Sequence, residues 1–212
     1  MNRVSFLIDG FNLYHSVKDA QIDMNGTTTK WLNIRELCQS YLHHFGRNAQ
    51  LGEIYYFSAL AEHLEATKPD VTARHRIFLR CLRETEININ LNRFKKKEYH
   101  CPHCHKRVIR HEEKETDVAM ATMVLGLFLE DRCDTVVLVT GDTDLIPAVK
   151  ISNHLFPDRK IVFAFPYKRK NKELMQLCPG SFTINKKQYV NHQFPNPFRT
   201  KNGKEIAKPL SW

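Results

Sequence analysis

The chain has 212 residues, with 32 Lys and Arg against 23 Asp and Glu, which gives a formal net charge of +9. A chain of this length can form one domain with a full hydrophobic core, and the basic balance favours polyanionic partners. The longest apolar run, residues 119–129, is too short to cross a bilayer, and the six scattered cysteines do not form a secreted disulfide framework. These features exclude a membrane-spanning or disulfide-rich protein and predict a cytoplasmic location.

The pattern of apolar residues predicts strands that alternate with helices. Strands are expected at residues 5–8, 53–59, 87–92, 134–140 and 160–165, and helices at 11–20, 34–45, 69–84, 118–129, 144–153 and 171–177. This alternation is typical of parallel βαβ units. Residues 87–92 alternate strictly between apolar and polar side chains, which is typical of an edge strand with one solvent-exposed face. Three prolines among polar residues predict an extended tail at 191–212, packed loosely or folded only against a partner, after a domain spanning 1–190.

Acidic residues follow two of the expected strands. Asp9 comes directly after the first strand, and Asp142 and Asp144 follow the strand at 134–140. A fourth acid, Asp117, stands just before the apolar helix at 118–129. Capping of a following helix explains any one of these acids, but it explains the whole set less well. In an open α/β sheet, ligands bind at the carboxyl ends of the strands.

Four carboxylates that converge on one pocket repel one another unless a cation neutralises them. Oxygen-only ligands suit Mg²⁺ or Mn²⁺. Sites of this kind commonly catalyse displacement at phosphorus, where the metal activates water and screens the phosphate. The acidic set therefore predicts a phosphodiesterase or nuclease.

Three segments carry a more specific signal. Residues 6–13 (FLIDGFNL), 113–121 (EKETDVAMA) and 138–147 (LVTGDTDLIP) resemble, in order and spacing, the signature blocks of NYN domains, which are relatives of PIN-domain nucleases. The resemblance runs from about residue 3 to about residue 165. It implies an α/β fold, a three-layer α/β/α sandwich with a mostly parallel central sheet, and a ribonuclease that depends on Mg²⁺ or Mn²⁺. By the same resemblance the metal-binding and catalytic residues are Asp9, Asp117, Asp142 and Asp144, with Asn12 and Thr140 completing the pocket.

One departure from the family pattern bears on activity. Many NYN sequences have a further Asp five residues after the position of Asp117, where this chain has Thr122. The change favours one-metal chemistry, weaker metal affinity or a site retained only for binding. An RNA-binding or regulatory protein with weak or no activity is therefore the alternative. A phosphatase of the haloacid dehalogenase type is disfavoured, because it needs Asp-x-Asp where this chain has Asp9-Gly10-Phe11.

A basic insert at residues 94–112 separates the expected edge strand from Asp117. Within it, Cys101 and Cys104 have the spacing of a zinc knuckle, and His103 and His105 are neighbouring candidate ligands. No second Cys pair follows at ribbon spacing, so a zinc site would be incomplete or irregular. A redox pair and two inert cysteines are the alternatives.

RNA, single-stranded or structured, is the expected partner, and a homo-oligomer is compatible with the sequence. Three basic groups are candidate RNA contacts, on the helix at 69–84, in the insert and after the strand at 160–165. A solvated helix face or a solubilising loop is the simpler explanation of such runs taken singly. The candidate residues are Arg76, Arg80, Arg83, Lys95, Lys96, Lys97, Lys168, Arg169 and Lys170.

Overall fold

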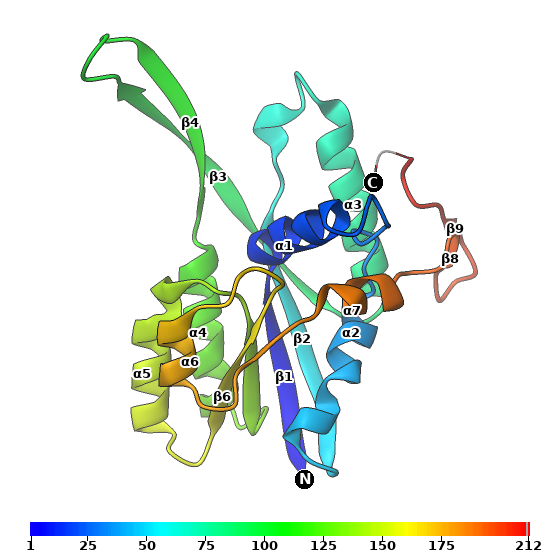
Figure 1. Ribbon diagram of the computed structural model, residues 1–212, viewed down its shortest axis with the longest axis vertical. Coiled ribbons are helices and arrows are strands. Elements are labelled where there is room, and N and C mark those ends of the chain that lie inside the picture. Colours follow the sequence, from blue (N-terminus) through cyan, green and yellow to red (C-terminus); the bar gives the residue numbers. More distant parts are fainter. Residues whose placement is uncertain (211) are drawn as a thin grey trace.

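A seven-stranded sheet forms the centre of the protein in a computed structural model that describes residues 1–210 and 212 (Figure 1). The strand order is β4-β3-β2-β1-β5-β6-β7, and all neighbouring pairs are parallel except β3 and β4. The strands are β1 (Asn2–Asp9), β2 (Ala49–Ala59), β3 (Asn88–His100), β4 (Arg107–Lys114), β5 (Thr135–Val139), β6 (Lys160–Phe165) and β7 (Phe182–Thr183). Because the parallel strands share one direction, their carboxyl ends meet at one edge of the sheet.

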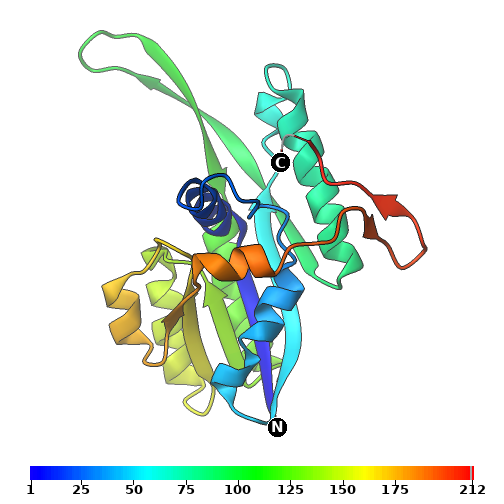
Figure 2. The same ribbon diagram turned by 45° about the vertical axis from the view of Figure 1, so that its right-hand side comes forward.

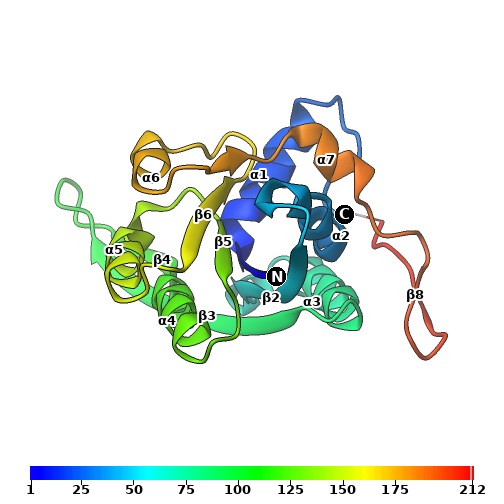
Figure 3. The ribbon, with the colours of Figure 1, turned by 90° about the horizontal axis from the view of Figure 1, so that it is seen from below.

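Helices cover both faces of the sheet (Figure 3). One layer holds α1 (Gly10–Ile22), α2 (Ile34–Ser40), α3 (Pro69–Glu84) and α7 (Lys186–Asn191). The opposite layer holds α4 (Thr116–Leu129), α5 (Ile146–Leu155) and α6 (Lys172–Leu177). Side chains alternate along β1, so that Phe6 and Ile8 pack in the first layer's core and Leu7 in the second. This arrangement confirms the predicted three-layer α/β/α sandwich with a mostly parallel sheet.

The hairpin beside the sheet edge is longer than predicted. In the described part of the chain, residues 88–92 of β3 pair with β2 alone, as an edge strand does, and β3 then continues to pair with β4 over residues 93–100. The basic insert lies in this continuation: it extends β3 and returns as β4, forming a long hairpin that projects from the sheet (Figure 2). β4 escapes prediction because most of its residues are charged or polar and exposed, so it lacks apolar alternation.

Short elements complete the chain. The predicted helix at 34–45 is divided, since α2 ends at Ser40 and a 3₁₀ turn, η1 (Leu42–Phe45), follows. Two further 3₁₀ turns are η2 (Glu62–Leu64) and η3 (Thr143–Leu145). Among the described residues, no helix combines the length and apolar character needed to cross a bilayer.

The segment 191–212 packs more closely than predicted. It carries a two-stranded hairpin of β8 (Phe198–Arg199) and β9 (Glu205–Ile206). Phe194 is only 3% exposed and Ile206 only 6%. The rings of Phe194 and Trp212 lie 5.8 and 6.0 Å from the ring of Trp31. These apolar side chains anchor the segment to the core, so the prediction of a loosely packed tail is wrong.

Candidate active site

The carboxyl ends of β1 and β5 bring the first acids together. The two strands are parallel neighbours, with Ile8 opposite Val139. The next residues along each strand are therefore adjacent, and the Thr140 hydroxyl donates to Asp9 Oδ2 at 2.9 Å. Asp142 follows two residues later, and its backbone N–H donates to Thr140 Oγ1 at 3.1 Å. Sheet register thus joins segments more than a hundred residues apart.

Capping and pocket formation coexist at these acids. Asp9 is the N-cap of α1 and its Oδ1 accepts from the Asn12 backbone N–H at 2.9 Å. Asp142 caps η3 by accepting from the Asp144 backbone N–H at 3.0 Å. These two bonds fix the directions of the carboxylates that open onto the cavity.

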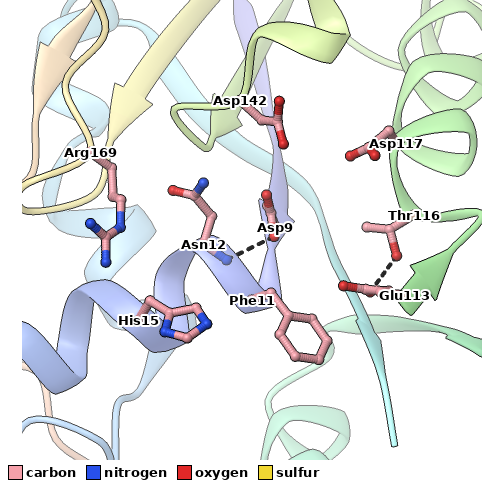
Figure 4. A pocket seen from close by; sticks show the side chains of 9 residues that line it. All are labelled: Asp9, Phe11, Asn12, His15, Glu113, Thr116, Asp117, Asp142 and Arg169. Atoms are coloured by element: carbon pink, nitrogen blue, oxygen red, sulfur yellow. Dashed lines mark hydrogen bonds between the residues drawn. The ribbon is translucent and has the colours of Figure 1, made fainter. Parts of the chain in front are cut away.

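A cavity of about 280 Å³ lies at this edge of the sheet. Four carboxylates on different elements line it: Asp9 on β1, Glu113 on β4, Asp117 on α4, and Asp142 after β5. Figure 4 shows them on one side of the cavity, with Arg169 on the other. The full lining comprises Asp9, Phe11, Asn12, His15, Glu113, Thr116, Asp117, Asp142 and Arg169.

Burial and repulsion from neighbouring carboxylates disfavour the ionised form of Asp9. Burial raises the pKa of its carboxyl, and the nearby charges of Asp117 and Asp142 raise the pKa further. Hydrogen bonds from Asn12 and Thr140 act in the opposite direction. The carboxylate is therefore held in place at an electrostatic cost, which a bound cation would reduce.

Glu113 is the pocket carboxylate that sequence reasoning did not single out. Burial, together with the charges of Asp9 and Asp117, raises the pKa of its carboxyl to about 7. Its carboxylate accepts a hydrogen bond from the Thr116 hydroxyl. Glu113 stands opposite Phe94 in the β3–β4 register, so recognising β4 as a strand would have placed it.

Asp144 lies outside the cavity lining and is exposed. It still acts on the site, because burial raises the pKa of Asp117 and the charges of Asp142 and Asp144 raise it further. Of the four predicted acids, the structure therefore brings three into the cavity and leaves the fourth beside it.

Thr122 also lies outside the cavity lining. Its side chain is exposed, and its hydroxyl donates to the backbone oxygens of Val118 at 2.9 Å and Ala119 at 3.1 Å within α4. A hydroxyl committed to its own helix does not orient a water in the pocket. The pocket draws its fourth carboxylate from Glu113 instead.

The basic residues of α3 do not line the cavity. Arg76 pairs with Glu62 at 3.0 Å and with Glu65 at 3.2 Å. Arg80 and Arg83 are exposed on the same helix. None of the three arginines lines the cavity.

The basic run after β6 reaches the pocket. Arg169 lines the cavity, and its guanidinium donates to Asp19 at 2.8 Å. Lys168 forms an ion pair with Asp23, and Lys170 is exposed. Of the candidate RNA contacts in this run, the structure therefore places Arg169 in the lining of the acidic cavity.

The insert lysines stand on β3. Lys96 pairs with Glu98 at 3.0 Å and Lys97 with Glu112 at 3.5 Å, and Lys95 is exposed. These ion pairs are solvent-exposed, so each holds its lysine only weakly.

The predicted zinc ligands lie at the tip of the β3–β4 hairpin. Cys101 and Cys104 are free thiols, and His103 and His105 are exposed. Within residues 1–210 and 212, no three His, Cys, Asp or Glu side chains are grouped so that they could hold a metal ion. One copy of the described chain therefore does not complete the zinc site that the Cys spacing suggests.

Comparison with known proteins identifies the family. The NYN domain family matches residues 3–185. No curated protein matches the chain. One solved structure to which the chain is similar is described as "Crystal structure of deacetylase-teicoplanin complex in biosynthesis pathway of teicoplanin". The two chains share 10% identity with a TM-score of 0.34, over 74% of this chain and 68% of that one. Since the family match spans most of the sequence and includes all three acidic segments, the chain belongs to the NYN domain family of PIN-like nucleases.

Proposed function

We propose that this protein is a divalent-metal-dependent endoribonuclease that hydrolyses RNA phosphodiester bonds. The observation that carries the proposal is the cavity itself. Carboxylates from β1, β4, α4 and the loop after β5 meet there, opposite the guanidinium of Arg169. A metal ion held by acidic ligands on one side and a guanidinium on the other could together screen the negative charge of a phosphodiester.

The donor set fits Mg²⁺ or Mn²⁺. All four side chains offer carboxylate oxygens, which these hard cations prefer. Burial raises the pKa values of Asp9, Glu113 and Asp117, so a bound cation would relieve a cost that the fold already carries. Because no three acids among the described residues are grouped at metal-binding spacing, we expect cation binding to draw them together. Asp9, Asp117 and Asp142 would hold the cation, with Asp144 contributing charge from outside the cavity.

When bound, such a cation activates water and screens the phosphate. The chain's own groups position the acids for this chemistry. Thr140 holds one oxygen of Asp9 while the Asn12 backbone holds the other. The Asn12 side-chain oxygen also accepts from the Gly141 backbone N–H at 3.3 Å, which ties the loops after β1 and β5 to each other.

Arg169 and the exposed basic residues would bind the substrate. A guanidinium can contact two phosphate oxygens at once, and a hydrogen bond to Asp19, which is outside the cavity lining, holds Arg169 in position. Lys95 on the hairpin and Lys170 beyond the rim are exposed, so they are free to add long-range attraction to the RNA backbone.

Cleavage of a labelled RNA panel tests the proposal. Single-stranded, structured and circular RNAs and a DNA control are incubated with Mn²⁺, Mg²⁺ or EDTA, for the wild type, Asp142→Asn and Asp158→Asn. Asp158 is the matched control, because it is exposed and outside the cavity. We expect metal-dependent cutting, including opening of the circle, in the wild type and Asp158→Asn only.

An RNA-binding or regulatory role without activity is the second candidate. The observation in its favour is that the described acids are not already grouped for metal binding. If no variant cuts any RNA in either metal but all shift RNA on a gel, with affinity falling steeply as salt rises, that role replaces the nuclease proposal.

A further inference from the structure

The tip of the β3–β4 hairpin stands apart from the rest of the molecule (Figures 1 and 2). Two backbone hydrogen bonds close its turn, from the Cys101 N–H to the Lys106 oxygen at 2.9 Å and from the His105 N–H to the Cys101 oxygen at 2.8 Å. His105 has a φ of 53°, in the left-handed region, which tightens the turn. Both thiols of the pair are therefore presented at the end of a projecting arm.

The turn brings the two cysteines side by side. The Cys104 side chain and the backbone N–H groups of His103 and Cys104 approach the Cys101 sulfur. Cys104 is exposed and Cys101 partly exposed, unlike the four buried cysteines. The pair thus faces solvent with its sulfur atoms together.

The pair by itself is half of a site. Tetrahedral zinc takes four ligands, and among the described residues no third His, Cys, Asp or Glu joins Cys101 and Cys104. Two coordination positions therefore have to be filled from outside the chain.

We infer that a second copy of this chain fills them, so that Cys101 and Cys104 of two copies bind one zinc ion between their hairpin tips. The projection of the arm leaves the tip free to meet an identical tip. Beside it, Val108 and Ile109 expose 40% and 48% of their surface, and tip-to-tip pairing would cover apolar area there.

Charge at the tip supports the pairing. A zinc ion with four thiolates carries a net charge of −2. Lys106 and Arg107 adjoin the cysteines in each copy and place positive charge near the zinc centre, with Arg107 also paired to Glu98. The metal centre offsets part of the repulsion between two basic hairpins, which would otherwise keep the tips apart.

Zinc titration of the reduced, metal-stripped protein tests the inference, with bound zinc and molecular mass measured on the same samples. We expect about one zinc ion for two chains, with doubling of the mass that a chelator reverses. Cobalt in place of zinc should give the absorption of a four-thiolate site. Cys104→Ser should stay monomeric and bind no zinc at the tip.

The Asp142→Asn variant distinguishes zinc binding at the hairpin tip from metal binding in the catalytic pocket, because the substitution alters the pocket and leaves Cys101 and Cys104 unchanged. It should bind zinc and dimerise as the wild type does. One zinc per monomer, dimers that form without zinc, or zinc-dependent dimers of Cys104→Ser would each overturn the inference. Since the readouts are zinc content and mass, failure of the nuclease proposal would not affect them.

Discussion

Gly141 and Arg169 make so close a backbone contact that a Cβ added to Gly141 would lie 2.1 Å from the Arg169 carbonyl oxygen. Gly141 joins Thr140 to Asp142, and Arg169 lines the opposite side of the cavity. The missing side chain at residue 141 therefore sets how closely the acidic loop and the basic loop approach each other.

Gly141→Ala should separate these two loops. The added methyl group meets backbone, which cannot rotate away, so the loop that carries Arg169 has to shift. We expect a loss of about 1–3 kcal/mol in the free energy of unfolding, measured by urea denaturation, and RNA cleavage slower by about tenfold or more. Gly126→Ala is the control, since nothing lies within 4 Å of a Cβ there. It sits inside α4 and should stabilise the protein by roughly 0.5–1 kcal/mol. Equal behaviour of the two variants would contradict this account.

Thr140→Val should disturb Asp9 without changing the shape of the site. The hydroxyl donates to Asp9 and accepts from the Asp142 N–H, and the variant loses both hydrogen bonds. We expect the free energy of unfolding to fall by about 1–3 kcal/mol, because a buried carboxylate loses its donor. Metal affinity, measured by calorimetry, should weaken as well. Thr140→Ser retains the hydroxyl and should resemble the wild type; a serine variant as impaired as the valine variant would indicate a packing role.

The site residues that stand at the carboxyl ends of parallel strands could be predicted from the sequence. Asp9 and Asp142 end apolar strands, and parallel pairing necessarily brings those ends to one edge of the sheet. The helix at 69–84 was predicted with its observed bounds, because Pro69 opens an amphipathic pattern. Glu113 was not predictable in the same way, since its strand is polar on both faces and is recognised only through its pairing with β3.

Glu113 should make the protein less stable as pH rises through neutrality. Its pKa is raised in the folded state from an ordinary 4.5 to about 7, so the folded protein binds this proton more tightly than the unfolded chain. Stability linked to Glu113 is therefore fully present below pH 4.5 and is lost as pH rises through about 7. Urea denaturation across this range should show a decline that is shallower in Glu113→Gln. Asp9 contributes in the same direction, so some slope should remain.

Exposed Glu173, outside the cavity, provides the matched control for Glu113. Glu173→Gln should keep the wild-type pH dependence of unfolding. Mg²⁺ or Mn²⁺ should stabilise the wild type more at pH 8 than at pH 5, because a cation then replaces the lost protons of the cavity. Stabilisation by metal that is the same at both pH values would argue against a cation bound at these carboxylates.

Arg169→Gln should weaken RNA binding more than it slows the chemical step. The guanidinium lines the cavity opposite the acids, and the lining formed by the described residues holds no other Arg or Lys. We expect KM to rise by about tenfold, and the slope of log affinity against log salt to fall by about one, as for a lost phosphate contact. Arg76→Gln is the control, since Arg76 is paired with Glu62 and Glu65 and does not line the cavity. It should leave both quantities unchanged within about twofold. If Arg76→Gln reduced the salt dependence while Arg169→Gln did not, the RNA path would run along α3 rather than across the cavity.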